Sequence, residues 1–150
     1  MLAIVQDLYE KKLVSYPRTS SQYITENELE YLKGNVEAYK EFLGVDVDVS
    51  KQGVGKRYVD GEKVQEHYAI VPTRQVASKD KLSAKELNIY QEILSTTLGM
   101  FAPVYEYEET LVDINVNDLI LSAKGKIDKF LGWKKLFKDD SRDKKRWCTS

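Results

Sequence analysis

Residues 15–21, with the sequence SYPRTSS, combine side chains whose types and order suggest chemistry on a phosphate. A tyrosine phenol becomes a good nucleophile once it loses its proton, and a guanidinium offers a planar fork of donors that fits two phosphate oxygens. Pro17 fixes its own φ and pushes Tyr16 out of the α region, so we expect an extended segment. Since residues i and i+2 of an extended segment project to the same side, Tyr16 and Arg18 are predicted to reach one common anion. The alternative is an ordinary turn with a buried tyrosine and a surface arginine.

His67 is the only histidine of the chain. An imidazole can donate to a phosphate or move a proton near neutral pH, although a lone histidine can equally be structural. Two other patterns do not support a site. Residues 53–56, GVGK, lack the spacing of a phosphate-binding loop, and Asp46 and Asp48 have no third carboxylate in step with them. We therefore predict no metal site within this sequence.

The composition describes an ordinary globular protein. With 150 residues the chain can bury one core, and 23 basic against 24 acidic residues give a net charge of −1. Any surface for nucleic acid must therefore come from local segregation of charge. The single cysteine, Cys148, rules out an internal disulfide and fits a reducing cytoplasm. We find no apolar run of about 18 residues and no secretory pattern, and so predict no membrane segment.

Periodicity and capping signals predict the elements that must position these residues. The 3.6-residue period predicts a helix over 1–12, which begins without an N-cap, so we expect the sequence to start inside a larger protein. Capping boxes at Thr25 and Ser83 open two further helices, which end near Gly44 and Met100, respectively. We expect their apolar stripes to form the core, together with residues 69–71.

Two hairpins are predicted from turn signals. An Asp-Gly turn between short alternating arms predicts a small β-hairpin over 58–64. From residue 105 the period changes to two, and Asn117-Asp118 is predicted to join two strands, the second ending at Gly125. The charged stretch that closes the chain has no apolar period, and residues 138–150 are predicted to be a disordered tail.

Five blocks of the sequence resemble those of type IA DNA topoisomerases, particularly bacterial topoisomerase III. Residues 8–21, LYEKKLVSYPRTSS, resemble the segment that carries the active-site tyrosine, with the approximate pattern LYE-x-x-x-I-[ST]-Y-P-R-T-D-S. Residues 66–73, EHYAIVPT, resemble the H-x-A-I-x-P-[TS] motif, and residues 82–90 resemble the family's LS-x-x-E-L-x-[IL]-Y helix start. Shorter runs at 105–110 and 132–137 also match, and all five blocks follow the family's order.

The resemblance implies a fold and a division of the chain. It implies an α+β protein with an active-site tyrosine domain over 1–104, mostly helical, with a small β-hairpin and similar to winged-helix (CAP-like) folds. Residues 105–137 would be the β-strand portion of an adjoining arch domain. Tyr16 would be the catalytic nucleophile and Arg18 would be catalytic as well as DNA-binding. The other implied DNA-binding residues are Thr19, Ser20, Ser21 and His67.

The implied activity is ATP-independent DNA isomerisation through a transient single-strand cut, with a 5′-phosphotyrosyl intermediate, strand passage and religation. The implied partners are single-stranded DNA and the remaining domains of the parent enzyme, one of which would bind Mg²⁺ through acidic residues absent from this chain. We expect the chain alone to be a monomer that cannot cleave DNA. Ser20 stands where the family usually has Asp, and Tyr68 where it often has Glu or His, so the proton-transfer arrangement is not implied.

Two other functions remain open at this stage. The chain could be a non-catalytic module for single-stranded nucleic acid, in which Tyr16 stacks on a base and Arg18 holds a phosphate. It could also be a plain interaction domain with no affinity for DNA. A Tyr16→Phe change separates the first alternative from the enzyme, and salt-dependent DNA binding separates the second.

Overall fold

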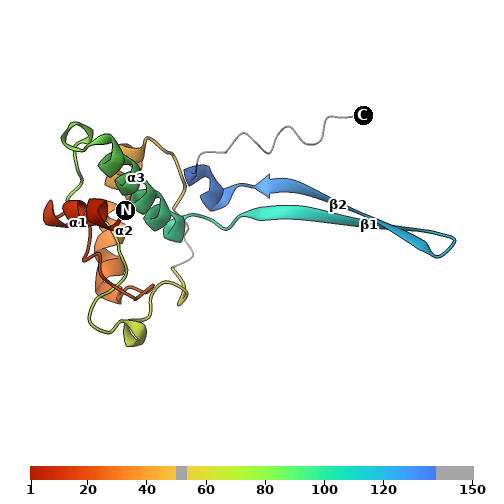
Figure 1. Cartoon of the computed structure of the whole chain (residues 1–150), viewed down its shortest axis with the longest axis horizontal. Helices are drawn as coiled ribbons and strands as arrows, with labels where there is room; N and C mark the ends of the chain where they lie inside the picture. Colours follow the sequence, from red (N-terminus) through yellow and green to blue (C-terminus); the bar gives the residue numbers. More distant parts are fainter. Residues whose placement is uncertain (50–53, 138–150) are drawn as a thin grey trace.

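A helical body and a long two-stranded hairpin make up the protein, as seen in a computed structural model that describes residues 1–49 and 54–137. Figure 1 shows the helices gathered at one end and the hairpin projecting away from them. The helices are α1 (Leu2–Glu10), α2 (Glu26–Leu43) and α3 (Ala84–Phe101), and the strands are β1 (Glu106–Val116) and β2 (Leu119–Phe130). Short 3-10 helices occupy Gly61–Lys63 (η1), Lys79–Lys81 (η2) and Gly132–Leu136 (η3). The predicted α+β class is confirmed.

Both predicted capping boxes are present. The Glu28 carboxylate accepts a hydrogen bond from the Thr25 backbone N–H (3.1 Å), and Gly44 ends α2 in the left-handed conformation, with φ 67°. At the start of α3, Ser83 Oγ accepts from the Glu86 N–H (3.3 Å), and Glu86 accepts from the Ser83 N–H (2.8 Å). These local bonds satisfy N–H groups that have no partner within a helix, so they fix where α2 and α3 begin.

Apolar side chains from all three helices form the core. The apolar stripes predicted for α2 and α3 are confirmed, except that Leu87 and Ile93 are only half-buried. The buried members of these stripes are Leu29, Leu32, Val36, Tyr90, Leu94 and Leu98. Burial raises the pKa of the Tyr90 phenol to about 12. The core holds α1 and α3 together, and Lys11 of the turn after α1 forms an ion pair with Glu86 (2.7 Å).

The hairpin is longer than predicted. Asn117 and Asp118 form its turn with φ of 49° and 66°, the conformation that asparagine and aspartate tolerate best, as the sequence indicates. Gly125 was predicted to end the second strand, and this is wrong: it pairs with Thr110 inside β2, which continues to Phe130. A glycine weakens a strand without ending it, and the β1–β2 hydrogen-bond ladder continues on both sides of Gly125. Every residue of β1 and β2 is exposed.

The predicted hairpin at 58–64 does not form. Residues after Asp60 instead wind into η1, where the Lys63 N–H donates to the Asp60 carbonyl (3.2 Å). Val59 pairs in parallel with Ile24, far away in the sequence, and is buried there. The arms on either side of the Asp-Gly pair are too short to bury apolar surface against each other, so the tertiary contact decides the conformation.

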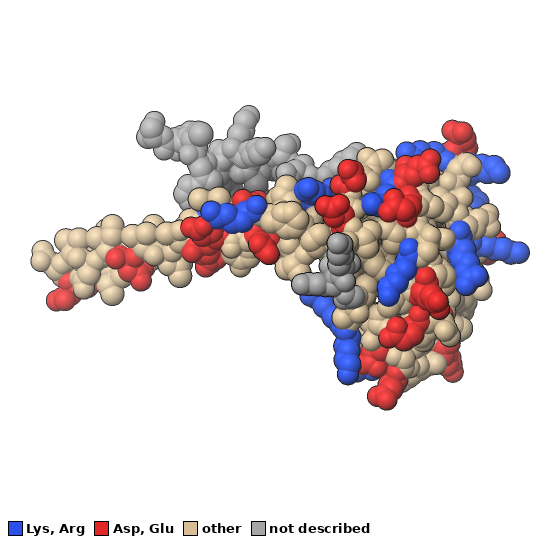
Figure 2. All heavy atoms as spheres, turned by 180° about the vertical axis from the view of Figure 1, so that it is seen from behind, with Lys and Arg blue, Asp and Glu red and all other residues tan. Residues whose placement is uncertain are grey.

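None of the helices within 1–49 and 54–137 is both long and apolar enough to cross a membrane. Figure 2 shows one face of the molecule, on which acidic and basic side chains are mixed over the helical body without a field of one sign. The tail predicted over 138–150 lies outside the described residues.

Candidate active site

The segment before Tyr16 runs antiparallel to the segment that follows His67. The Ser15 N–H donates to the Val71 carbonyl (2.9 Å), the Thr73 N–H donates to the Leu13 carbonyl (3.0 Å), and Val14 forms a bridge with Pro72. This long-range pairing stabilises extended backbone just before Tyr16, whereas the segment 16–18, predicted to be extended, bends at Pro17. Of residues 69–71, predicted to be core, only Val71 is buried. Ala69 is half-buried and Ile70 is exposed, because alternate side chains of an extended segment face opposite sides.

Ser15 fastens the two segments together. Its side chain is buried, with Oγ donating to the Ala69 carbonyl (2.9 Å) and accepting from the Val71 N–H (2.9 Å). This hydroxyl therefore satisfies a buried backbone donor next to the candidate nucleophile. Sequence reasoning gave Ser15 no role, since a serine before a tyrosine carries no signal of a partner more than fifty residues away.

Tyr16 lies between two other rings at the edge of a hollow. The edge of the Tyr9 ring meets the Tyr16 ring at 80° with centroids 5.4 Å apart, and the His67 ring packs against it at 4.4 Å. The half-buried Tyr16 lines an open cavity of about 780 Å³, which we name the tyrosine groove. The other residues of this groove are Tyr9, Glu10, Lys12, Val14, Ser15, His67, Tyr68 and Thr73. The structure therefore brings Tyr16 and His67 together, a contact that the sequence did not predict.

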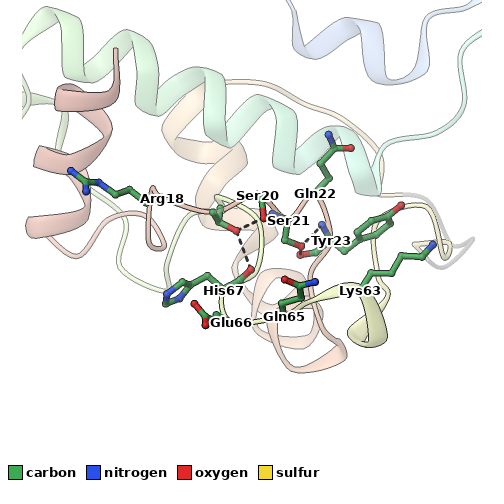
Figure 3. Close-up of a pocket in the computed structure, with 10 residues that line it drawn as sticks. Arg18, Ser20, Ser21, Gln22, Tyr23, Lys63, Gln65, Glu66 and His67 are labelled. Carbon is green, nitrogen blue, oxygen red and sulfur yellow. Dashed lines mark hydrogen bonds between the residues drawn. The ribbon is translucent and has the colours of Figure 1, made fainter.

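The hydroxyls after Arg18 hold the loop in place. Thr19 Oγ1 donates to the His67 carbonyl (3.0 Å) and accepts from the Ser21 N–H (3.1 Å), as the dashed lines in Figure 3 show. Ser21 Oγ in turn accepts from the Tyr23 N–H (3.2 Å). Ser20 is exposed and lines the cavity beside this loop. Thr19 thus ties the loop to His67, which leaves Ser20 as the freest hydroxyl of the three for a ligand.

Arg18 opens on a second hollow, of about 360 Å³, which we name the arginine pocket. Its remaining lining residues are Thr19, Ser20, Ser21, Gln22, Tyr23, Lys63, Gln65, Glu66 and His67. Figure 3 shows the exposed Arg18 side chain directed away from Ser20 and Ser21. Tyr16 and Arg18 line different hollows and His67 borders both, so the common anion of Tyr16 and Arg18 stays a prediction.

Two groups near the site have shifted pKa values. Asp60 accepts a hydrogen bond from the Lys63 ammonium and raises its pKa, with a further contribution from Tyr23, whose ring lies 4.9 Å from Lys63 Nζ. Lys63 is therefore a fixed cation of the arginine pocket. Burial, and then the charge of Glu28, raise the pKa of Tyr68, which stands where the resembled family often has a titratable Glu or His. Tyr68 is a neutral hydroxyl at physiological pH.

Within 1–49 and 54–137, no group of three or more His, Cys, Asp or Glu side chains is placed to hold a metal ion. Around the two adjoining hollows lie a nucleophile candidate, three cations, two carboxylates, an imidazole and several hydroxyls.

A family model described as DNA topoisomerase matches residues 1–148, and the chain belongs to this family. The chain is similar to DNA topoisomerase 3 of Bacillus subtilis, with 34% identity over 154 residues, which covers 97% of this chain and 21% of the relative. The enzyme of the same name from Bacillus licheniformis is 35% identical, covering 96% and 21%, and that of Shouchella clausii is 36% identical, covering 89% and 19%. The resemblance to topoisomerase III stated from the motifs is confirmed, and the chain spans about a fifth of the length of these relatives.

Proposed function

We propose that this chain supplies the nucleophile of a type IA DNA topoisomerase and that Tyr16 is that nucleophile. The observation that carries the proposal is the packing of the Tyr16 ring against His67 at 4.4 Å on the wall of the tyrosine groove. A buried structural tyrosine would be enclosed by core side chains, whereas Tyr16 lies beside a hollow large enough for part of a nucleotide strand.

The proposed reaction is a reversible transesterification. Tyr16 Oη attacks the phosphorus of a phosphodiester in single-stranded DNA, so that the Oη–P bond forms and the P–O3′ bond breaks. The phenol gives up one proton and the departing 3′ oxygen gains one, leaving a 5′-phosphotyrosyl ester and a 3′ hydroxyl. After another strand has passed through the gap, this hydroxyl attacks the ester and restores the phosphodiester. Because the ester conserves the energy of the bond, no ATP is needed.

The neighbouring side chains are assigned roles by their chemistry. Arg18 neutralises the charge that develops on the phosphorane-like transition state. His67 and Ser20 contact the DNA backbone, while Thr19 and Ser21 hold the loop through the bonds described above, so that the strand is fixed relative to Tyr16. Ser20 in place of the family's usual Asp removes a carboxylate from beside the nucleophile, so we assign it no part in proton transfer.

We propose that Mg²⁺ is held by acidic residues of the longer parent protein rather than by this chain. That arrangement agrees with the fraction of the relatives that the chain spans. We further propose that residues 1–104 correspond to a winged-helix-like tyrosine domain and that the hairpin belongs to the adjoining arch. The chain on its own is then expected to bind a single strand without cutting it.

The test mixes this chain with a separately produced acidic metal domain of a type IA enzyme and asks whether labelled single-stranded DNA becomes covalently attached. An adduct that forms with the wild type and is lost in Tyr16→Phe supports the proposal. An adduct that persists in Tyr16→Phe overturns the assignment of the nucleophile. An adduct formed by this chain alone with Mg²⁺ overturns the division of the site between two domains.

The non-catalytic module remains the second candidate, because the tilted packing of Tyr16 on His67 is also what a base-stacking platform would show. In that case Tyr16→Phe retains the affinity for single-stranded DNA and no adduct forms under any condition.

A further inference from the structure

A third hollow continues the two that form the candidate active site. It has a volume of about 690 Å³ and ends at Trp133 and Phe137 in and after η3, and we name it the tryptophan pocket. His67 lines both the tyrosine groove and the arginine pocket, and Gln22 and Tyr23 line both the arginine pocket and the tryptophan pocket. The three hollows therefore adjoin one another in a single track that begins at Tyr16 and ends at Trp133.

Long-range pairing builds the floor of this track. Ile24 exchanges hydrogen bonds with Tyr58 (2.9 Å) and Asp60 (3.1 Å), which brings residues 57–60 alongside 22–24. On the other side, the Ala69 N–H donates to the Tyr23 carbonyl (2.9 Å). Figure 3 shows the same order, with Arg18 at one end of the labelled side chains and Tyr23 and Lys63 at the other.

The end of the track presents an aromatic face. Trp133 is 40% exposed, its backbone N–H donates to the Pro103 carbonyl (3.0 Å), and its ring meets the Phe137 ring edge to face at 5.9 Å. Gly132 makes this position possible: with φ at 50°, a Cβ there would lie 2.4 Å from the Pro103 carbonyl oxygen. The backbone at Trp133 is therefore held in place, the Tyr105 ring also meets the indole at 6.5 Å, and the residue stays partly exposed to a ligand.

Cations and aromatic rings alternate along the track. Its cations are Lys12, Arg18, Arg57 and Lys63, against the carboxylates of Glu10 and Glu66 and that of Asp60, which pairs with Lys63 at 3.3 Å. Two of these cations lie over ring faces: Lys63 over Tyr23 (4.9 Å) and Arg57 over Tyr58 (5.5 Å). Four cations against three carboxylates leave the track slightly basic in a chain whose net charge is −1. On such a surface the cations can contact phosphates and the aromatic rings can stack on unpaired bases, a combination typical of sites for single-stranded nucleic acid.

We propose that one nucleic-acid strand follows this track from Tyr16 past Arg18 and Lys63 to Trp133, where a base stacks on the indole. This inference rests on the proposed function and extends it, because it assigns a stacking residue and a phosphate contact, Arg57, in the tryptophan pocket, away from the nucleophile. A duplex would not use such a surface, since its base faces are already stacked on one another.

The test measures binding of oligothymidylates of about 4 and about 16 nucleotides, the range that single-strand sites cover, by fluorescence anisotropy with the full chain. Trp133→Leu is expected to weaken binding of the longer strand about 5- to 150-fold, the range for one lost base stack, and to leave the shorter strand unaffected. Phe130→Leu is the matched control, because Phe130 is 42% exposed at the end of β2 and does not line the track. Arg57→Ala is expected to reduce the slope of log K against log[salt] by about one, as the loss of one phosphate contact predicts.

A direct readout comes from the indole itself. The chain has two tryptophans, so Trp147→Phe leaves Trp133 as its only one. The longer strand should then quench the tryptophan fluorescence. Equal binding of the long strand by the Trp133→Leu and Phe130→Leu variants, or no quenching on saturation, overturns the inference. If Arg18→Ala still weakens binding in that case, the proposed function stands while the inference falls. Absence of any binding by the wild type overturns the inference, and the covalent assay then decides the proposed function separately.

Discussion

Replacing Ser15 with alanine should loosen the tyrosine segment from the segment that follows His67. The change removes the hydrogen bond from Ser15 Oγ to the Ala69 carbonyl and deprives the buried Val71 N–H of its side-chain acceptor. A hydrogen bond contributes about 0.5–1.5 kcal/mol and an unsatisfied buried donor costs about 1–3 kcal/mol, so after partial relaxation we expect a loss of about 2–3 kcal/mol. That is a large fraction of the roughly 5–15 kcal/mol by which small domains are stable.

The measurement is thermal and urea unfolding followed by circular dichroism. For a domain of this size the expected loss corresponds to a fall in Tm of about 4–12 °C. Ser20→Ala is the matched control in the same segment, because its exposed hydroxyl can be replaced at a cost within about 0.5 kcal/mol. Hydrogen exchange of the Val71 amide should also accelerate in the Ser15→Ala variant. Equal stability of the two variants, with unchanged exchange at Val71, would refute the assignment of a clamp to Ser15.

Two further predictions concern the start of α3 and the seat of η3. The hydrogen bond from the Lys11 ammonium, and next that from the Ser83 N–H, lower the pKa of Glu86 from its usual 4.5. The ionised Glu86 therefore stabilises the fold fully above pH 4.5, and this stabilisation is lost as the pH falls through the lowered pKa. Glu86→Gln should therefore flatten the acid limb of a stability–pH profile, and an unchanged limb would contradict the ion pair's role. Gly132→Ala places a Cβ at a left-handed φ and against the backbone of residues 103–104. The change should therefore lower the free energy of unfolding by about 1–2 kcal/mol or more and alter the Trp133 fluorescence. Gly125→Ala, which meets open space within β2, is the control, and an equal effect of both changes would show that the contact at Gly132 is unimportant.

Local signals in the sequence predicted much of the fold correctly. The capping boxes at Thr25 and Ser83, the glycine after α2 and the turn at Asn117-Asp118 are where the sequence places them. Each depends on bonds between residues a few positions apart, so nearby residue types are enough to specify it. Where a local signal competed with a distant partner it failed: the Asp-Gly pair after Val59 gave a 3-10 helix because Val59 pairs with Ile24.

The candidate site divides in the same way. Five motif blocks in the family's order, including residues 15–21 and the block around His67, were enough to suggest the family, which the comparisons confirm, and to select Tyr16, Arg18 and His67 as candidates. The sequence by itself thus determined the residue types available for chemistry. Only the tertiary structure decided that Tyr16 packs on His67, that Arg18 lines a separate pocket, and that a track continues to Trp133. These relations depend on backbone pairing between segments tens of positions apart, and no local pattern encodes the register of such pairing.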